Sequence, residues 1–243
     1  MATNTYSSTW FRLYMPRQTE ELTRNEVAFL SRQLPLPRYR RLLDLCCGQG
    51  RHAIGMAESG YEVTGLDRDA EALAEAERRT RAANQHVTYV NGDMREVGAL
   101  PGMFDAVINM WQSLAYFDEA TNAELLRQIH GKLTPGGRFI VDLYNREFFE
   151  RNQGEKREEI AGTIVDSRGY MEGNRWHSVI TYRDAHGDII DSDHMEWQMF
   201  TPGEFVAWAA EYGFTSRLVC TWADENRAPS PDVARMQVVL ERG

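Results

Sequence analysis

Two carboxylates and two glycines stand in a spacing that suits a bound nucleoside. Asp44 lies in an apolar run and precedes Gly48 and Gly50, where a helical pattern begins. Asp67 follows about twenty residues after the glycines, at the end of a second apolar run. Glycines at a strand-to-helix turn let the backbone approach a ligand, and the later acid can accept hydrogen bonds from ribose hydroxyls. The spacing predicts a nucleoside site at the first crossover of an α/β sheet.

The acid before the glycines separates two kinds of nucleoside. A dinucleotide would bring its pyrophosphate to this turn, where Asp44 would repel it, whereas an ammonium group would be attracted. Backbone amides at the helix start suit a carboxylate, and Cys46 lies inside the same turn. S-adenosylmethionine carries both groups and becomes S-adenosylhomocysteine after reaction, so we expect it as the cofactor. Because Gly48 to Ala53 also fits G-x-G-x-x-A, the glycines alone leave a nicotinamide cofactor open.

Other cofactor contacts are expected at neighbouring strand ends. Arg68 follows the ribose acid, and Asp93 and Met94 follow the third apolar run. The Asp93 carboxylate can accept a hydrogen bond from the adenine amine, while Met94 can pack on the ring. Asn109 and Met110 lie at the mouth of the fourth run and are expected to face the ligand. Capping of a turn or helix is the alternative for the two acids.

An aromatic segment precedes the first helical pattern. Tyr6, Trp10 and Tyr14 could close over a sulfonium, because ring faces attract cations. We expect Tyr14 to contact the cofactor; the alternative is that these rings only hold the arm on the fold. Tyr116, after the fourth strand, is expected in the pocket or in the core.

Apolar runs alternate with helical patterns, which indicates right-handed βαβ units and a parallel sheet. Strands are expected at 41–46, 61–66, 87–91, 103–110 and 137–143, and helices at 18–33, 51–59, 69–83 and 119–132. Residues 146–158 are highly charged and are expected to form an exposed connector. An antiparallel meander is expected over 160–200, followed by a capped helix at 202–212 and two last strands.

The sequence therefore divides into four expected parts. They are an N-terminal arm and helix over the cofactor (1–36), a Rossmann-like core (37–150), an antiparallel β insertion (151–200), and a C-terminal helix with strands that complete the core (201–243).

Composition limits the compartment and the partners. The net charge is -9, with no basic run, which argues against nucleic-acid binding. No apolar run is long enough to span a bilayer, and three cysteines without a disulfide pattern suit the cytoplasm. No zinc or serine-hydrolase motif is found, and we expect no metal. The Cys46 and Cys47 thiols, near a helix start, could have lowered pKa values.

As a set, these motifs resemble the class I S-adenosylmethionine-dependent methyltransferases. The resemblance rests on four segments: Leu43–Gly50, Val63–Asp67, Gly92–Met94 and Leu133–Gly137. It implies a doubly wound seven-stranded α/β sheet with an antiparallel last strand. Gln49 stands where that family more often has Thr or Ser.

A nearer resemblance is to bacterial enzymes related to glycine N-methyltransferases and amino-sugar N,N-dimethyltransferases. It rests on Gln112–Phe117, Val141–Asn145 and the β-rich stretch 160–200. In those enzymes the extra strands cover the substrate or form a dimer contact. An Asn-Pro-Pro-Tyr type motif, typical of enzymes that methylate nucleic-acid amines, is absent at Asn109–Gln112.

The expected activity is methyl transfer to a nitrogen or oxygen of a small molecule. Tyr116 and Asn145 are the candidate catalytic residues, and Tyr144, Arg175 and His177 are the candidate substrate-binding residues. Two alternatives remain at this point: an NAD(P)-dependent oxidoreductase, which Asp44 disfavours, and a non-catalytic adenosyl-binding module.

Overall fold

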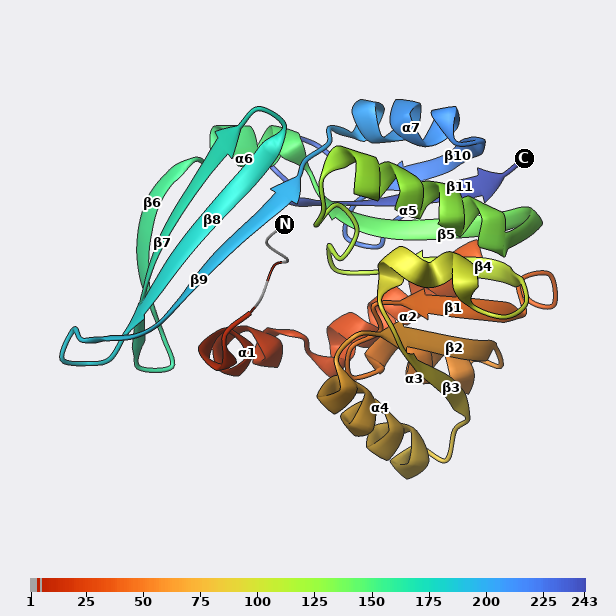
Figure 1. Cartoon of the computed structure of the whole chain (residues 1–243), viewed down its shortest axis with the longest axis horizontal. Coiled ribbons are helices and arrows are strands. Elements are labelled where there is room, and N and C mark those ends of the chain that lie inside the picture. The colour runs from red at the N-terminus through yellow and green to blue at the C-terminus, as the bar shows by residue number, and fades with distance from the viewer. Residues whose placement is uncertain (1–3, 5) are drawn as a thin grey trace.

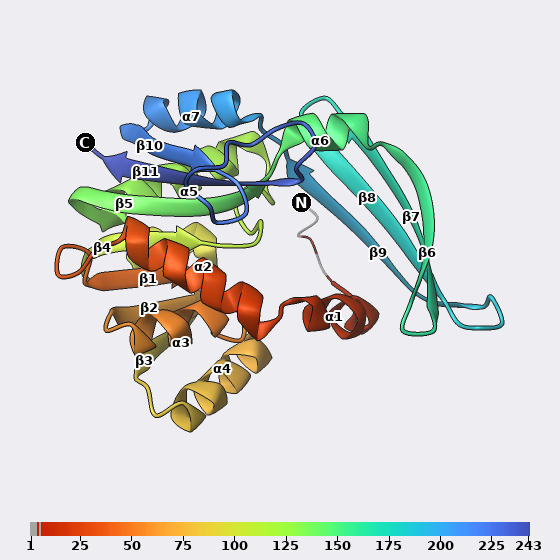
Figure 2. The same ribbon diagram turned by 180° about the vertical axis from the view of Figure 1, so that it is seen from behind.

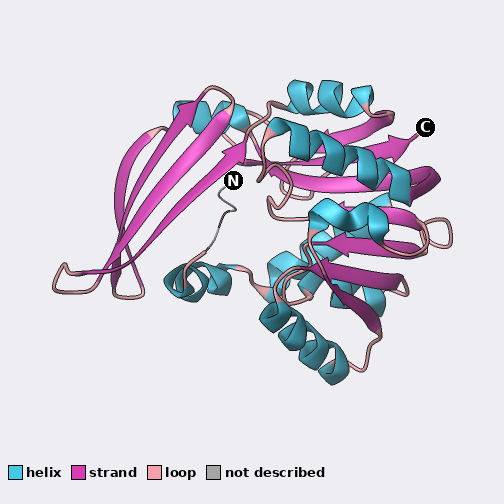
Figure 3. Cartoon of the chain, in the orientation of Figure 1, coloured by secondary structure: helices cyan, strands magenta, loops and turns pink. Residues whose placement is uncertain are grey.

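The computed structural model describes residues 4 and 6–243, which form two sheets side by side (Figures 1 and 3). The larger sheet has seven strands in the order β10-β11-β5-β4-β1-β2-β3. These strands are β1 Arg41–Leu45, β2 Glu62–Asp67, β3 Val87–Asn91, β4 Phe104–Asn109, β5 Leu133–Tyr144, β10 Phe214–Cys220 and β11 Arg235–Arg242. β1 to β5 pair in parallel, and β11 runs antiparallel to both of its neighbours. The predicted α/β fold, with its antiparallel last strand, is confirmed.

Helices cover both faces of this sheet (Figures 1 and 2). The helical elements are α1 Ser8–Tyr14, η1 Met15–Arg17, α2 Glu20–Gln33, α3 Arg51–Glu58, α4 Ala70–Ala82, η2 Met94–Ala99, α5 Glu119–Lys132, α6 Arg146–Arg151 and α7 Pro202–Glu211. Successive β1 residues point to opposite faces, as in any strand. Leu43 and Leu45 therefore join the core under α5 and α7, whereas Leu42 joins the core under α2 and α3. By the same alternation, Asp44 faces the side on which α3 begins.

Three helices begin at a residue whose side chain caps the helix. Thr19 accepts a hydrogen bond from the Leu22 amide, and Asp69 caps α4 through the amides of Glu71 and Ala72. Thr201 opens α7 with a complete capping box. Such caps stabilise a helix by about 1 kcal/mol each, because they satisfy amides that have no partner within the helix.

The second sheet is antiparallel, with strand order β6-β7-β8-β9. Its strands are β6 Gly154–Ile160, β7 Thr163–Glu172, β8 Arg175–Arg183 and β9 Ile189–Gln198. The predicted insertion after strand five is confirmed, but the exposed connector expected at 146–158 is wrong. That stretch forms α6 and most of β6. Its charged side chains suit an edge strand with solvated faces, so high charge did not exclude a strand here.

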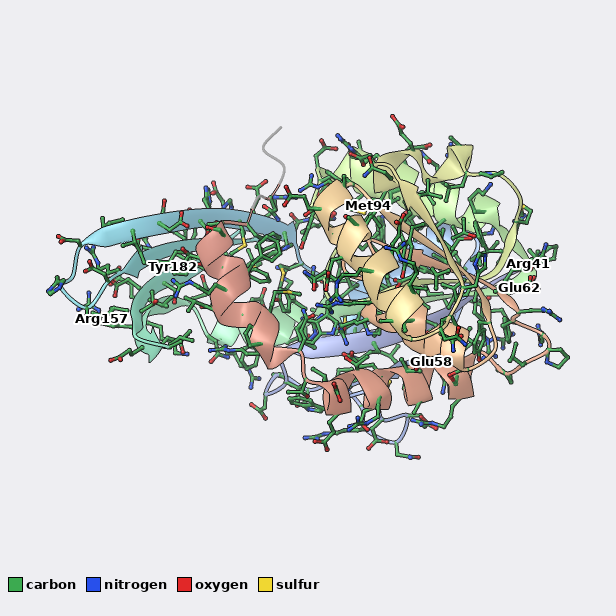
Figure 4. All side chains as sticks on the ribbon, turned by 90° about the horizontal axis from the view of Figure 1, so that it is seen from below. Arg41, Glu58, Glu62, Met94, Arg157 and Tyr182 are labelled. Carbon is green, nitrogen blue, oxygen red and sulfur yellow. The ribbon has the colours of Figure 1, made fainter. Side chains whose placement is uncertain are left out.

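The N-terminal arm connects the two sheets. The Asn4 side chain pairs with the backbone of Glu196 on β9, and the Asn4 carbonyl accepts a hydrogen bond from Arg68 after β2. Helix α1 packs on the inner face of the second sheet through Leu13. In Figure 4, α1 lies beside the four-stranded sheet near Tyr182. The predicted arm also includes residues 1–3 and 5, which lie outside the described residues.

In the part of the chain that the structure describes, no helix has the length and apolar character needed to cross a membrane.

Candidate active site

A cavity of about 1090 Å³ lies between the carboxyl ends of the central strands and the inner face of the second sheet. Ten of the residues predicted for the site line it. They are Tyr14, Cys46, Gly48, Asp67, Arg68, Asp93, Met94, Met110, Tyr116 and Tyr144. Figure 4 labels Met94, on the side of the larger sheet. The cavity thus joins the glycine turn to the aromatic arm, although these segments are far apart in the sequence.

The glycine turn is held by the acid that follows β2. The Gly48 amide donates to Asp67 Oδ2 at 2.7 Å, and the Asp69 amide donates to Asp67 Oδ1 at 2.9 Å. Gly48 and Gly50 have φ values of 52° and 78°, which favour glycine. A carboxylate has about four lone-pair positions, so Asp67 can still accept from ribose hydroxyls. Gly50 lies behind the lining, where a Cβ would come within 2.5 Å of Tyr89 Oη.

Asp44 is buried behind the same turn and does not line the cavity. Its side chain is 2% exposed, and Oδ2 has no hydrogen-bond partner among the described atoms. Burial raises the pKa of Asp44 to about 7, although the charge of Arg51 opposes the shift. A buried carboxylate oxygen without a partner is unfavourable, and a neighbouring ammonium would relieve this. The residue therefore fits the charged tail of S-adenosylmethionine.

The adenine end of the cavity combines an acid with soft side chains. Asp93 pairs with Arg95 at 2.6 Å, which is the main reason that the pKa of Asp93 is lowered. Met94 Sδ lies 3.2 Å from Cys46 Sγ, so both sulfurs form one apolar patch. Burial raises the pKa of the Cys46 and Cys47 thiols, contrary to the lowering considered from the sequence.

A buried polar network adjoins the cavity, and no sequence pattern indicates it. Glu26 on α2 accepts hydrogen bonds from Arg51 Nη1 at 2.5 Å, His52 Nε2 at 2.9 Å and Trp111 Nε1 at 2.7 Å. Burial would raise the pKa of Glu26, but the bonds and charges of His52 and Arg51 outweigh it and hold that pKa at about 2. A lone acid in an amphipathic helix usually points to solvent, so only the tertiary structure identifies this one.

The loop after β4 has an unusual backbone. Trp111, Gln112 and Ala115 have positive φ values, which are uncommon outside glycine and often accompany functional sites. Asn109 supports the loop: its amide donates to Leu45 O at 2.7 Å and its oxygen accepts from the Leu114 amide at 2.9 Å. Asn109 is fully buried and lies outside the lining, so the structure places it as a support rather than at the ligand surface.

At the other end of the cavity, two tyrosines from separate segments meet. The hydroxyl groups of Tyr6 and Tyr116 are 2.5 Å apart. Burial raises the pKa of Tyr116 to about 12 and that of Tyr6 well above its usual value, so both remain protonated at neutral pH. The Tyr144 and Trp197 rings are 5.5 Å apart, and Trp197 Nε1 is buried without a partner among the described atoms. Aromatic faces with a few polar groups make up this end.

Comparisons with known proteins agree with this geometry. Residues 42–137 match the family model described as a methyltransferase domain. Cypemycin N-terminal methyltransferase from Streptomyces sp is 31% identical over 230 residues, covering 89% of this chain and 88% of that protein. The chain belongs to the S-adenosylmethionine-dependent methyltransferases.

Other methyltransferases match to different extents. The dTDP-3-amino-3,6-dideoxy-alpha-D-glucopyranose N,N-dimethyltransferase from Streptomyces fradiae is 36% identical, over 68% of this chain and 65% of that protein. Putative methyltransferase YqeM from Bacillus subtilis is 35% identical, but the match covers only 44% of its length, and several curated relatives likewise match over about half of theirs. The structure of SAM-bound CalS10, an amino pentose methyltransferase from Micromonospora echinaspora, has a TM-score of 0.71 and 26% identity over the full length of both chains.

Three residues predicted for the acceptor side of this methyltransferase lie outside the cavity. Asn145 is fully buried and caps α6, while its amide donates to the Ser230 and Val233 carbonyls. Arg175 donates to Phe117 O and pairs with Glu196. His177 stacks on Tyr170 with ring centroids 4.9 Å apart. The structure thus gives Asn145 a capping position and puts Arg175 and His177 away from the lining.

Strand alternation explains the correction on β8. Trp176, Ser178 and Ile180 line the cavity, so Arg175 and His177 must point to the opposite face of the strand. The same period places Met195 and Trp197 of β9 in the lining. These five residues were missed, although the alternation of apolar residues in β8 was a usable signal.

Proposed function

We propose that this methyltransferase transfers the methyl group of S-adenosylmethionine to a nitrogen of a small molecule. The observation that carries the proposal is one continuous cavity with a cofactor-type turn at one end and an aromatic pocket at the other. The amino-sugar N,N-dimethyltransferase and the cypemycin N-terminal methyltransferase among its relatives support nitrogen as the methylated atom. When bound, S-adenosylmethionine would supply a methyl group on a sulfonium, from which the thioether leaves readily.

The residues of the aromatic pocket support alignment rather than strong base catalysis. Among the described lining residues from the arm, the loop after β4 and the second sheet, none is an acid or a histidine. Burial disfavours a charged ammonium, so an amine entering this pocket loses its proton more readily than in water. Tyr6 and Tyr116, both protonated, can hold the neutral nitrogen by hydrogen bonds. Orienting the reactants can contribute several kcal/mol to the barrier reduction.

The aromatic walls also suit the product. Methylation of an amine gives a cation, and a cation near Tyr or Trp faces gains about 0.5–2 kcal/mol. An alcohol acceptor would instead need a base to take its proton, and the described lining residues from the arm, the loop after β4 and the second sheet include no carboxylate.

The test is incubation of the purified protein with methyl-labelled S-adenosylmethionine and a panel of small amines, each paired with the matching alcohol. Label in the amines supports the proposal. Label only in the alcohols, or NADH binding in place of S-adenosylhomocysteine, would overturn it. Tight binding of S-adenosylhomocysteine with no turnover on any acceptor would favour a non-catalytic adenosyl-binding module.

The assembly and the compartment are proposals of the same kind. We infer a homodimer through the second sheet, at the start of β9, where Ile189 and Ile190 are exposed. Light scattering of the wild type and of an Ile190→Glu variant tests this. Cys46, Cys47 and Cys220 are free, which accords with a reducing cytoplasm.

A further inference from the structure

Glu26 organises one wall of the cavity. Its side chain is only 6% exposed, yet it accepts from a guanidinium, an imidazole and an indole. All three donors line the cavity: Arg51 and His52 from the start of α3, and Trp111 from the loop after β4. The Arg51 guanidinium lies 5.1 Å from the centre of the Trp111 ring, so the two side chains are neighbours as well as partners of Glu26.

One N–H donor group of Arg51 has no hydrogen-bond partner among the described atoms. Its Nη1 is saturated, because it donates to Glu26 and, at 3.0 Å, to Thr23 Oγ1. Its Nη2 is buried and has no partner among the described atoms. An unpartnered buried donor costs about 1–3 kcal/mol, and more when the group is charged, so a bound carboxylate would stabilise this arrangement. The matching unpartnered acceptor is Asp44 Oδ2, on which Arg51 already acts electrostatically.

We propose that Arg51, held in place by Glu26, receives the carboxylate of the cofactor's amino-acid tail, and that the charge of Asp44, buried behind the turn, attracts the ammonium of that tail. The inference rests on the proposed function and adds the residues that recognise the tail. Glu26 is then a positioning residue: it touches no ligand, but it directs the free side of the guanidinium. A carboxylate and a guanidinium form a charge-assisted pair, which is roughly twice as strong as a neutral hydrogen bond.

Burial singles out Arg51 among the described arginines that line the cavity. Its side chain is 17% exposed, whereas Arg17, Arg68 and Arg79 are exposed residues. Arg79 is paired with Glu75, and Arg68 donates to the Asn4 carbonyl. Charges in water are screened, so an ion pair at Arg51 contributes more to affinity than one at an exposed arginine.

The experiment compares two ligands that differ only in the tail. S-adenosylhomocysteine has the amino-acid group, whereas 5′-methylthioadenosine has the same nucleoside and sulfur without it. Calorimetry would measure both ligands on the wild type and on Arg51→Gln, Arg51→Lys and Glu26→Gln. Arg17→Gln tests the alternative that Arg17, another arginine of the lining, receives the carboxylate. Glu21→Gln is the matched control for Glu26→Gln, because it makes the same change at an exposed position of the same helix.

Arg51→Gln is expected to lower the affinity for S-adenosylhomocysteine at least tenfold. Its affinity for 5′-methylthioadenosine should stay within twofold of the wild-type value. The S-adenosylhomocysteine affinities of Arg51→Lys and Glu26→Gln should lie between those of Arg51→Gln and the wild type. Arg17→Gln and Glu21→Gln should bind it as the wild type does. Equal loss of both ligands in the Arg51 and Glu26 variants would overturn the inference, because it would show a general defect of the turn. So would full S-adenosylhomocysteine affinity in Arg51→Gln, or a selective loss in Arg17→Gln. A wild type that binds neither ligand would instead overturn the proposed function.

Discussion

The hydroxyl groups of Tyr6 and Tyr116 meet at 2.5 Å, although Tyr6 belongs to the N-terminal arm and Tyr116 to the loop after β4. The contact closes the acceptor end of the cavity and ties the arm to the loop. The acceptor pocket therefore depends on two segments that share no strand or helix.

Tyr116→Phe should lower turnover without weakening cofactor binding. The variant loses a hydroxyl that can orient the acceptor nitrogen, and loss of one buried hydrogen bond of about 1.4 kcal/mol corresponds to a tenfold fall in kcat/KM for the acceptor. Steady-state kinetics and S-adenosylhomocysteine calorimetry measure the two effects. Tyr170→Phe, on the opposite face of the second sheet, is the matched control and should behave as the wild type. A similar loss of cofactor affinity in Tyr116→Phe would contradict the assignment.

Cofactor affinity should depend on pH through Asp44. The pKa of this carboxyl is about 7 in the free protein, and a bound ammonium favours the ionised form. Binding of S-adenosylhomocysteine should therefore weaken as the pH falls below about 7, approaching tenfold per pH unit. Calorimetry between about pH 5.5 and 7.5, at intervals of about half a pH unit, measures how the affinity changes with pH. Asp44→Asn should bind weakly and show no such slope; a wild type without the slope would exclude Asp44 as the group responsible.

The same substitution should stabilise the ligand-free protein. The pKa of Asp44 is raised in the folded state, so the unfolded chain ionises first and stability is lost as the pH rises from about 4 to 7. Asp44→Asn removes this loss and should raise the free energy of unfolding at pH 7.5 by about 1–4 kcal/mol. Urea unfolding of both proteins without ligand measures the difference. No gain at pH 7.5, or an equal gain at pH 4, would show that ionisation is not the cause.

Gly50→Ala should destabilise the protein by about 2–3 kcal/mol. Its φ of 78° disfavours any side chain, and the new Cβ would lie 2.5 Å from Tyr89 Oη. Adding Tyr89→Phe should recover part of the loss, because it removes the closest atom. Gly131→Ala, in the last turn of α5 with open space around it, is the control and should cost no stability. Thermal or urea unfolding compares the four proteins.

A pair of adjacent substitutions tests which face of β8 meets the acceptor. Ser178→Phe puts a ring into the cavity and should raise the acceptor KM at least tenfold, while S-adenosylhomocysteine binds as before. Val179→Phe puts the same ring on the outer face, where Val179 is 38% exposed, and should leave the kinetics unchanged. The reverse result would mean that the strand faces are misassigned.

Local patterns predicted the parts of the fold that depend on local physics. The helices expected at 18–33, 69–83 and 202–212 begin at Thr19, Asp69 and Thr201, whose side-chain oxygens satisfy nearby amides without help from the rest of the chain. The glycine turn and Asp67 were likewise readable, since their spacing follows from one βα crossover. The charged strand β6 could not be predicted from local patterns, because edge strands tolerate residues that otherwise suggest a loop.

The acceptor side was harder to predict for two reasons. A one-residue difference along a strand reverses the face, so Ser178 lines the cavity whereas the predicted residue His177 does not. Polar residues at strand ends can also support the backbone instead of binding a ligand, as Asn109 and Asn145 do here. The Glu26 network joins residues from α2, α3 and the loop after β4, and such contacts are visible only after folding.

The strands that wall the acceptor form one unbroken stretch of chain, from Gly154 to Gln198, outside the segments that make up the glycine turn. Mutations that reshape this stretch can change which acceptors bind while the glycine turn stays intact. Such a layout lets related enzymes evolve different substrate ranges while each keeps the ability to transfer a methyl group.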